Sequence, residues 1–580
     1  MQFKHNTAMH VLLIYPPPWK IPEPGQQSVE TGEGPPPGIN SALLLSGDIL
    51  HIPCGLLSLA AQAKRAGRSV EVLNLFTFTW DRIVEIIKAR PADFFGLSCF
   101  TSNRRGTLAL ARLIRELYPQ AHIAVGGPHA TALPGEMLEH CSAIDTIVIG
   151  EGEETVARLL RAIETGSPAR NIPGTAYRSS GRILLAPQRP RLDDLDELAA
   201  SCGYAPDHIL MTSRGCPWDC SFCASTCIWG KNVCSHSPEY VLNVLQTLVN
   251  QYGRKALAIK DETFTLNRNR VMAVCRGIIK RGLNFLWSCD TRADYLDAEL
   301  LIVMRRAGCV RISLGVESAS PEVLARIGKG IAPADIRQAV ALARQLGFQI
   351  RLYMIAGAPG ETRASLEQSI AFIRDIEPTE VIWNPYTLFP GTRDFFAALQ
   401  RGEAATEDFF TKNFFELTPM LDRRDDSDAR FCIGWLQRHQ GLQQLAGYTA
   451  AQRREIFERL PGLPAAHLDL AAACYGEGDF DAARAAAKTA LQLGYPLPGL
   501  CRNLLACIGA ATGDIKTALE ELIAAKSLGL HAVVERNIAA AQRWIAAGGP
   551  DSNTPLMLDA DCAFEVTRSL VQPVMPGPIA

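Results

Sequence analysis

Short apolar segments that alternate with amphipathic helices constrain the fold of this chain more than any other feature. Between residues 10 and 149, strand-like segments such as His10–Tyr15, Val70–Leu75 and Thr146–Ile149 are separated by segments with helical spacing. In the helix expected at 55–66, apolar residues recur at positions i, i+3, i+4 and i+7. This alternation predicts a parallel, doubly wound, Rossmann-like sheet whose ligand loops follow the carboxyl ends of its strands.

A second series of strand–helix units begins near Asp207. Its strands are expected to end at Ser213, Lys260, Cys289, Leu314, Ile355 and Pro385. Six units are too few to close an eight-stranded barrel, so a partial (βα)6 barrel is predicted. Residues at the carboxyl ends of these strands are the candidates for chemistry.

Three cysteines lie in the loop after the first of these strands. Cys216, Cys220 and Cys223 stand in Thr-Ser-Arg-Gly-Cys-Pro-Trp-Asp-Cys-Ser-Phe-Cys-Ala. Three thiolates this close can hold three corners of a cubic iron–sulfur cluster and leave one iron for a small ligand. A zinc site that also uses Cys227 and Cys234 is an alternative, because structural zinc takes four ligands. A two-cluster ferredoxin would need a second run of cysteines with this spacing, and the sequence has only one.

This triplet resembles the loop of the radical S-adenosylmethionine (SAM) superfamily. The resemblance implies that the three cysteines bind a 4Fe-4S cluster whose open iron holds the amino and carboxylate groups of SAM. A thiolate from Cys227 would block that iron. The resemblance also implies SAM contacts from Asp261 or Glu262 to the ammonium, Ser288 and Arg292 to the ribose or carboxylate, Glu317 to the ribose hydroxyls, and Phe222 and Gly357 to the adenine. Because Cys234 stands where relatives often have an arginine, the carboxylate partner stays open between Arg292 and Lys231.

Two glycine-rich loops follow strands of the first domain. Gly126-Gly-Pro-His129 and Gly150-Glu-Gly-Glu153 let a bulky planar ligand approach the backbone. With Ser98 at another strand end, they resemble the cobalamin-binding domain that precedes many radical SAM domains. The resemblance implies that cobalamin is bound by Ser98, Gly126, Gly127, His129, Gly150, Glu151 and Gly152. The Asp-x-His-x-x-Gly signature is absent, so we expect a base-off cofactor, with His129 as a hydrogen-bond donor or loop residue rather than an axial ligand.

Alanine-rich helices form a third part of the chain. The segments that begin at Gly478 and Gly513 are similar at a shift of 35 residues, which resembles tetratricopeptide (TPR) repeats. Such helices bind a peptide, form a dimer contact or cap the enzyme. The expected division is a cobalamin-binding domain at 1–153, a linker with a hairpin at 154–205, the partial barrel at 206–400, a helical substrate-cap segment at 401–464, an all-α TPR-like region at 465–546 and a disordered or loosely packed tail at 547–580. The aromatic segment Phe409–Phe415 either contacts substrate or packs on the barrel.

The composition narrows the class of protein. A net charge of −2 gives no reason to expect nucleic acid or an anionic membrane as a partner. The 17 cysteines show no regular framework, which suits a reducing compartment. No apolar stretch approaches the length of a membrane span, so a cytoplasmic protein is expected.

The resemblances together imply an enzyme. The expected reaction is methylation of an unactivated carbon or phosphorus centre through methylcobalamin and a 5′-deoxyadenosyl radical, with a flavodoxin or ferredoxin as electron donor. The alternative is an oxidative cyclisation or ring rearrangement like that of the tetrapyrrole cyclases. A cobalamin sensor without catalysis is a third possibility, against which the intact triplet argues. The substrate, whether small molecule, lipid or peptide, cannot be read from the sequence.

Overall fold

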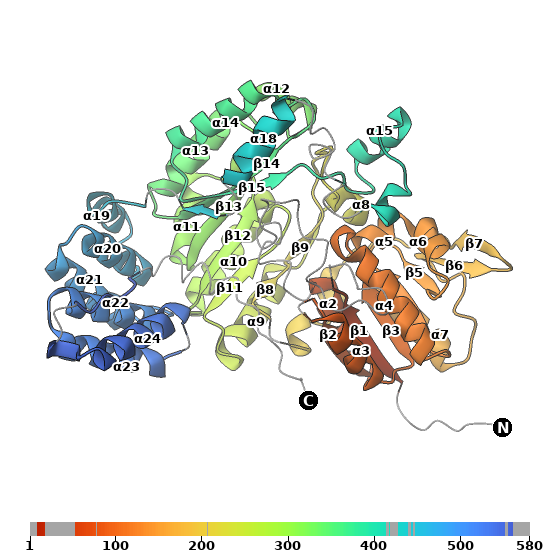
Figure 1. The fold of residues 1–580 in the computed structure, drawn as a ribbon, viewed down its shortest axis with the longest axis horizontal. Coiled ribbons are helices and arrows are strands. Elements are labelled where there is room, and N and C mark those ends of the chain that lie inside the picture. The colour runs from red at the N-terminus through yellow and green to blue at the C-terminus, as the bar shows by residue number, and fades with distance from the viewer. Residues whose placement is uncertain are drawn as a thin grey trace.

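The computed structural model of this chain describes residues 9–17, 53–76, 78–205, 207–412, 417, 427–438, 442–444, 447–529, 531–551 and 555–560. It has three parts in a row (Figure 1): an α/β domain at the N-terminal end, a second α/β domain in the middle, and a stack of helices at the far side of the second domain. No helix among these residues is long and apolar enough to cross a bilayer.

The first sheet has the strand order β2-β1-β3-β4-β5-β6-β7. Its strands are β1 (His10–Tyr15), β2 (Ser69–Asn74), β3 (Phe94–Ser98), β4 (His122–Gly126), β5 (Thr146–Val148), β6 (Thr175–Ser179) and β7 (Arg182–Leu185). The first five run parallel, and β6 and β7 continue the sheet antiparallel. The hairpin that was expected in the linker is therefore part of this sheet. The order reverses between β1 and β3, which is where doubly wound sheets bind ligands.

Helices cover both faces of this sheet because its strands are apolar on both sides. Leu12 and Ile14 of β1 pack toward α3 (Trp80–Lys88) and α4 (Arg104–Leu117). The alternate residues Val11 and Leu13 pack toward α2 (Cys54–Arg65) and α7 (Glu153–Glu164). Successive residues of a strand point to opposite faces, so one continuous apolar segment supplies both cores.

The second sheet has six parallel strands and one antiparallel edge strand. They are β8 (Ile209–Leu210), β11 (Ala256–Ile259), β12 (Leu286–Thr291), β13 (Cys309–Glu317), β14 (Gln349–Ala356), β15 (Glu380–Pro385) and the edge strand β16 (Leu442–Gln444). The helices that cover it include α9 (Pro238–Gln246), α10 (Arg268–Lys280), α11 (Ala298–Arg306), α13 (Pro333–Arg344) and α14 (Arg363–Ile376). The predicted partial barrel is confirmed, whereas β16 was not expected.

The chain leaves the barrel sheet before the cysteine loop. Instead of extending β8, residues Ser213–Arg214 form β9 and pair antiparallel with β10 (Cys234–Ser235). This small ribbon closes the base of the loop that carries the three cysteines. The loop then continues into a short helix, α8 (Ser225–Trp229).

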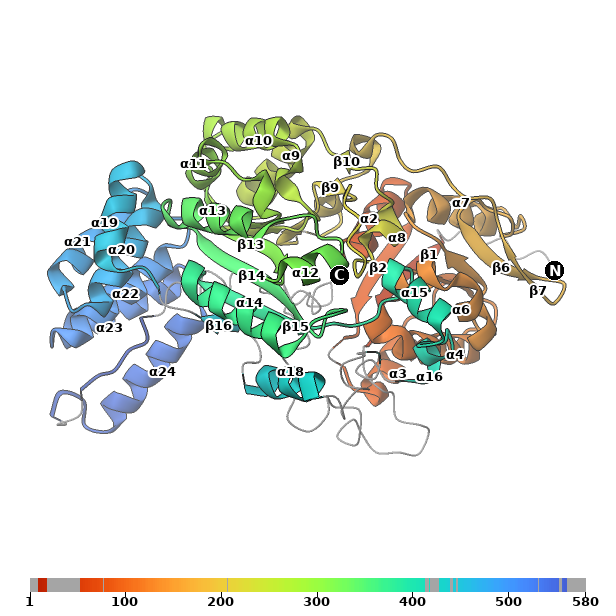
Figure 2. The same cartoon turned by 90° about the horizontal axis from the view of Figure 1, so that it is seen from above.

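The segment after the barrel returns to the first domain. Helices α15 (Arg393–Arg401) and α16 (Asp408–Thr411) lie beside α6 (Pro134–His140), as Figure 2 shows. Phe410 stacks on His140 with ring centroids 4.0 Å apart, and Phe409 packs on Phe395. These two aromatic residues therefore serve packing. The remaining phenylalanines of the predicted aromatic segment, at 414 and 415, lie outside the described residues.

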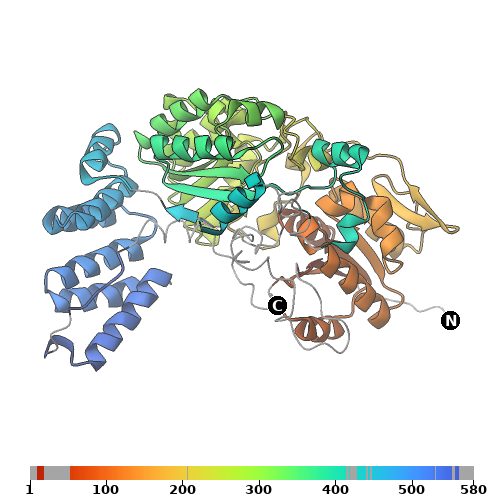
Figure 3. The ribbon, with the colours of Figure 1, turned by 45° about the horizontal axis from the view of Figure 1, so that its top comes forward.

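Among the described residues, five helices form the C-terminal stack, which the barrel separates from the first domain (Figure 3). They are α20 (Pro464–Gly476), α21 (Phe480–Gln492), α22 (Pro498–Ala511), α23 (Ile515–Ser527) and α24 (Ala532–Ala546), and α19 (Ala450–Arg459) joins them to the barrel. The predicted helical region is confirmed, and its relation to TPR proteins stays a prediction.

Residues 555–560 lie in the tail that was expected to be disordered or loosely packed, and they contact the helical stack. Leu556 is 4% exposed and belongs to an apolar cluster with Trp544 of α24. The main chain of Asp559 is hydrogen-bonded to two helices of the stack. Composition indicated disorder because the tail is polar and proline-rich, whereas Leu556, Leu558 and the main chain of Asp559 hold residues 555–560 on the stack.

Candidate functional site

The three cysteines of the triplet stand on one loop held from both sides. The amide of Cys223 donates to the carbonyl oxygen of Cys220 at 3.2 Å. Between them, the Ser221 amide donates to the Ile327 carbonyl at 2.8 Å, and the Ser221 hydroxyl donates to Asp394 at 3.0 Å. All three cysteine residues are partly exposed. The loop therefore presents its sulfur atoms while its backbone is fixed by the barrel.

The two downstream cysteines point elsewhere. A Cβ atom added to Gly391 would lie 2.4 Å from Sγ of Cys227, so this thiol packs against that glycine. The Cys234 thiol donates to the carbonyl oxygen of Asp193 at 3.4 Å. The arrangement favours the three-cysteine reading over a four-ligand zinc site.

Two neighbouring carboxylates at the end of β11 have different surroundings. Asp261 is buried and accepts hydrogen bonds from the amide and hydroxyl of Thr212, both at 2.5 Å, and from the hydroxyl of Ser213 at 2.7 Å. It fixes the chain just before the cysteine loop. Glu262 accepts from the amide of Gly215 at 3.3 Å and from Ser225 at 3.2 Å, on either side of the cysteines. Burial raises the pKa of Glu262 above its ordinary value.

Glu317 ends β13 in an unusual backbone conformation. Its φ of 68° lies in the left-handed region, which a non-glycine residue adopts only at a cost. Its carboxylate accepts from the ammonium of Lys329 at 2.8 Å, and both side chains are buried. Sequence reasoning found Glu317 but missed Lys329. The only signal for the lysine was its position in Gly328-Lys-Gly330 after α12 (Pro321–Arg326).

Arg292 is committed to protein contacts. Its guanidinium donates to both carboxylate oxygens of Asp294, at 3.0 and 2.9 Å, and to the carbonyl of Lys329 at 2.9 Å. It also lies 4.0 Å from the ring centroid of Trp218, which stands inside the cysteine loop. Lys231, the other expected carboxylate partner, pairs with Asp219 at 3.0 Å. Arg292 therefore joins the cysteine loop to the loop of Lys329.

The predicted adenine contacts are brought together. Phe222 packs beside Ile355 and Ala358 at the end of β14, next to Gly357. Gly357 has a φ of 81°, and its amide donates to Glu361 at 2.6 Å. Burial raises the pKa of Glu361 to about 7. Ser288 is also buried, but it lies within β12 rather than at its carboxyl end.

A cavity of about 350 Å³ lies between the carboxyl edge of the first sheet and the barrel. Six of the seven residues predicted for the first domain's ligand line it: Ser98, Gly126, Gly127, Gly150, Glu151 and Gly152. At Gly127, where φ is 99°, a Cβ atom would lie 2.7 Å from the carbonyl oxygen of Cys99. The cavity extends inward to Leu13 and Gly96 on the face of the sheet.

The seventh predicted residue, His129, does not line this cavity. Its ring is 1% exposed and lies near Thr101, with Nδ1 3.2 Å from the hydroxyl, and against the edge of Phe410. Burial lowers the pKa of His129 to about 3, so the ring is neutral. The expectation of a cofactor hydrogen bond from His129 has no support in this position, because the side chain points away from the glycine loops.

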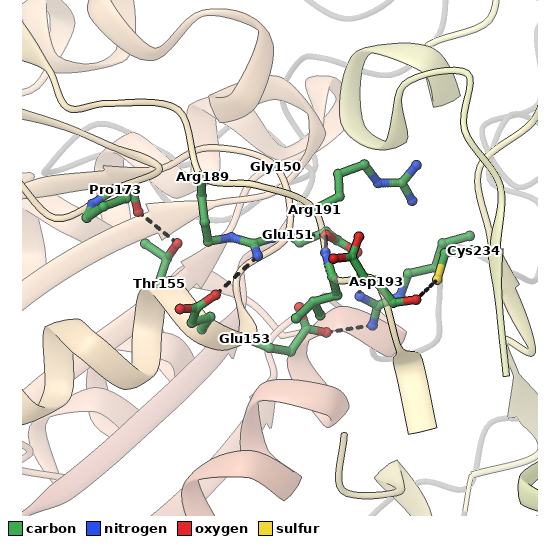
Figure 4. Close-up of polar contacts among 12 residues, drawn as sticks. Gly150, Glu151, Glu153, Thr155, Pro173, Arg189, Arg191, Asp193 and Cys234 are labelled. Carbon is green, nitrogen blue, oxygen red and sulfur yellow. Dashed lines mark hydrogen bonds and ion pairs between the residues drawn. The ribbon is translucent and has the colours of Figure 1, made fainter. Parts of the chain in front are cut away.

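Acidic residues of the second glycine loop join the two domains. Glu151 pairs with Arg189 at 2.9 Å and with Arg214 of β9 at 3.0 Å, and Glu153 pairs with Arg214 at 2.6 Å. Figure 4 shows Glu151, Glu153 and Arg189 in this network. Burial alone would raise the pKa of Glu153, but the charge and hydrogen bonds of Arg214 hold it below the ordinary value. Sequence reasoning missed Arg214, although it stands two residues before the triplet.

Comparison with known proteins places both α/β domains in known families. The model of the B12 binding domain matches residues 41–160, and that of the radical SAM superfamily matches residues 210–373. A relative from Pyrococcus horikoshii, named an uncharacterized methyltransferase PH0819, is 32% identical over 59% of this chain and 77% of its own length. This chain belongs to the cobalamin-dependent radical SAM enzymes.

Two further comparisons bear on this family of cobalamin-dependent radical SAM enzymes. The anaerobic magnesium-protoporphyrin IX monomethyl ester cyclase of Rubrivivax gelatinosus is 30% identical over 59% of this chain, but the match spans 64% of the cyclase. The radical SAM methyltransferase TsrM of Kitasatospora setae, solved with cobalamin and a [4Fe-4S] cluster, aligns with a TM-score of 0.54 at 18% identity over 68% of this chain and 75% of its own. At this identity, the likeness to TsrM shows the fold alone.

The residues present fit the cofactors of this family. Three partly exposed cysteines on one fixed loop, with Cys227 turned away, suit a 4Fe-4S cluster with an open iron. The cavity between the two domains, our candidate cobalamin cavity, is edged by Gly126, Gly127, Gly150 and Gly152, and their lack of side chains lets a ligand approach the backbone. Its inward extension along the sheet face suits a cofactor tail in the base-off form.

Aromatic residues of the barrel form the opposite wall of the cobalamin cavity. Trp229 of α8, His236 and Tyr240 line it. The His236 ring stacks on Tyr240 with centroids 4.0 Å apart, and its Nδ1 lies 2.9 Å from Asp196. Burial lowers the pKa of His236 although Asp196 opposes the shift. Sequence reasoning missed this wall because no spacing or composition signal marks its three residues, although Trp229 lies only six residues after Cys223.

Proposed function

We propose that this chain transfers a methyl group from SAM to an unactivated carbon or phosphorus centre, with cobalamin as the methyl carrier. The observation that carries the proposal is the wall shared by the two cofactor sites. Helix α8 begins two residues after Cys223, and its residues Ile228 and Trp229 line the cobalamin cavity. One short helix therefore connects the cysteine loop to the wall of the cavity, which suits an enzyme that uses both cofactors on one substrate.

The side chains around the cysteine loop bind and orient SAM in this proposal. When bound, the cluster supplies one electron to cleave SAM, and cobalamin supplies a place to carry the methyl group. Glu262 accepts hydrogen bonds from the methionine ammonium, because both carboxylate oxygens of its neighbour Asp261 already accept hydrogen bonds from Thr212 and Ser213. Glu317 takes the ribose hydroxyls while Lys329 holds its carboxylate. Phe222 and the backbone of Gly357 form the apolar wall for adenine.

The Gly150–Glu153 loop fixes the distance between the two domains. Each buried carboxylate of this loop is paired with Arg214, two residues before Cys216. Arg214 also lies 5.2 Å from the ring centroid of Trp229 on the cavity wall. This network positions the cysteine loop relative to the cobalamin cavity without touching substrate. A reduced flavodoxin or ferredoxin is the expected electron donor, because the cluster needs a one-electron reductant.

Methyl-deuterated SAM distinguishes the proposed reaction from a cyclisation. The protein is reconstituted anaerobically with iron, sulfide and cobalamin, mixed with labelled SAM and reductant, and studied by mass spectrometry. Transfer of the deuterated methyl group to protein-bound cobalamin is the expected result. Release of 5′-deoxyadenosine while bound cobalamin stays unlabelled would contradict methyl transfer and support the reaction class of the Rubrivivax cyclase. Absence of both products from a cluster-replete protein would support a cobalamin sensor.

A further inference from the structure

Two buried asparagines of the C-terminal stack hold the main chain of the segment that follows it. Asn503 of α22 is 0% exposed and Asn537 of α24 is 1% exposed. Their side-chain amides both donate to the carbonyl oxygen of Asp559, at 3.1 and 2.8 Å. The amide of Asp559 donates back to the side-chain oxygen of Asn537 at 2.7 Å. Burying an amide is costly unless its hydrogen bonds are satisfied, and here a peptide backbone satisfies them.

The two asparagines occupy equivalent positions in α22 and α24, which are alternate helices of the stack. They are 34 residues apart, the same interval that separates the first residues of α22 and α24. One interval earlier, the equivalent position of α20 is Asp469. Asp469 accepts from Arg305 of the barrel at 3.0 Å and from Arg453 of α19 at 3.2 Å. One position of the stack therefore contacts the barrel in α20 and a peptide segment in α22 and α24.

The segment lies in an extended form with alternating burial. Leu556 is 4% exposed, Met557 is 75% exposed, and Leu558 packs partly against the same cluster as Leu556. Arg536 of α24 pairs with the Asp559 carboxylate at 2.7 Å. Main-chain hydrogen bonds combined with sites for alternate side chains are how proteins bind extended peptides. The helices of the stack therefore bind a segment with the pattern leucine–x–leucine–aspartate.

We propose that this asparagine face, formed by Asn503, Arg536 and Asn537, is a docking site for an extended segment of a partner protein. The partner segment carries apolar side chains at alternate positions followed by an acidic residue, and residues 555–560 occupy the site in cis. Asn503 and Asn537 read main-chain groups that any extended peptide offers, so another chain of this pattern can replace the tail. The cis segment follows α24 closely, so its high effective concentration sets the affinity that a partner must exceed.

A labelled peptide and a protein with a released tail test the proposal. The probe is a fluorescein-labelled peptide with the sequence of residues 552–561. The full chain with Leu556→Ser and Leu558→Ser is expected to bind it, by fluorescence anisotropy, at least tenfold more tightly than the wild type, whose own tail competes. Adding Asn537→Ala should weaken binding at least tenfold, whereas Glu535→Gln, on the exposed side of the same helix, should not change it. A peptide with serines in place of both leucines is the control ligand.

Three other outcomes would overturn the proposal, and a second experiment covers a variant that does not fold. If the serine variant keeps its helical circular dichroism and does not bind the peptide, the tail is a structural clasp only. If the variant does not fold, a protease site placed at residues 552–554 of the otherwise wild-type chain is cut after folding, and the labelled peptide should then exchange in. If the labelled peptide does not exchange in after cleavage, the tail has a structural role only. A concentration-dependent dimer that Asn537→Ala abolishes would assign the face to the tail of a second copy.

Discussion

The guanidinium of Arg214 lies 2.6 Å from the carboxylate of Glu153, across the junction of the two α/β domains. One partner belongs to the ribbon that carries the cysteine loop, and the other begins the helix after the glycine loop of the cobalamin cavity. Both side chains are largely buried. Movement of one cofactor domain relative to the other would expose or break this pair, so it holds the two sites in one geometry.

Replacing Arg214 with methionine should destabilise the protein strongly. The variant leaves the buried carboxylates of Glu151 and Glu153 without one of their partners, which costs roughly 3–5 kcal/mol when a buried pair is broken. Chemical unfolding of the cofactor-free protein measures the loss. Arg268→Met is the matched control, because Arg268 also pairs with two carboxylates but on the surface, where such pairs are worth about 0–1 kcal/mol. Equal effects of the two variants would contradict the assigned role.

The same pair predicts a dependence on acid. Because Arg214 holds the pKa of Glu153 below the ordinary value of 4.5, the pair stabilises the folded state above that pH. This contribution is lost as pH falls through the lowered pKa. The difference in unfolding free energy between wild type and Arg214→Met should therefore shrink when the pH is lowered from 6 toward 3. A difference that stays constant over this range would show that the arginine acts through packing alone.

Much of the fold followed from periodicity, and much of the site from spacing. Strand–helix alternation predicted both sheets. The spacing of the three cysteines predicted that the loop after the first barrel strand holds the cluster. Partners brought together by the tertiary fold were not predictable: Lys329 is 12 residues from Glu317, and Arg214 is 61 residues from Glu153. The sequence did not show that the His129 side chain turns back toward Thr101 while its loop lines the cavity, so a cofactor contact and a loop position both stayed open. His129 lies in the short helix α5 (Pro128–Ala132), and no local pattern encodes in which direction its side chain points.

The adjacent carboxylates Asp261 and Glu262 should respond differently to neutralisation. Asp261→Asn removes an acceptor from Thr212 and Ser213, so it should lower thermal stability and cluster content. Glu262→Gln should leave iron and sulfide content unchanged but weaken SAM binding about tenfold, because a charged acceptor for an ammonium is lost. Equilibrium dialysis with labelled SAM and iron analysis measure the two effects. If Glu262→Gln lost the cluster while Asp261→Asn kept normal SAM affinity, the structural role assigned to Asp261 and the SAM-binding role assigned to Glu262 would both be contradicted.

The cluster should depend on three cysteines and on no others. Alanine at Cys216, Cys220 or Cys223 should each remove the 4Fe-4S signal from reconstituted protein, measured by electron paramagnetic resonance after reduction. Alanine at Cys227 or Cys234 should leave it, since one thiol packs on Gly391 and the other bonds the Asp193 carbonyl. A normal cluster in Cys223→Ala together with none in Cys227→Ala would refute this ligand set.

Glu361, which accepts a hydrogen bond from the Gly357 amide, should make the free energy of unfolding depend on pH near neutrality. Burial raises its pKa from 4.5 to about 7, so the folded state holds this proton more tightly than the unfolded chain does. Its contribution to stability is therefore complete below pH 4.5 and is lost as pH rises through about 7. Glu361→Gln keeps an acceptor for the Gly357 amide but carries no charge, so above pH 8 it should be more stable than wild type by roughly 2–3 kcal/mol. Unfolding curves of both proteins from pH 5.5 to 8.5 should diverge as pH rises, and parallel curves would show that Glu361 titrates normally.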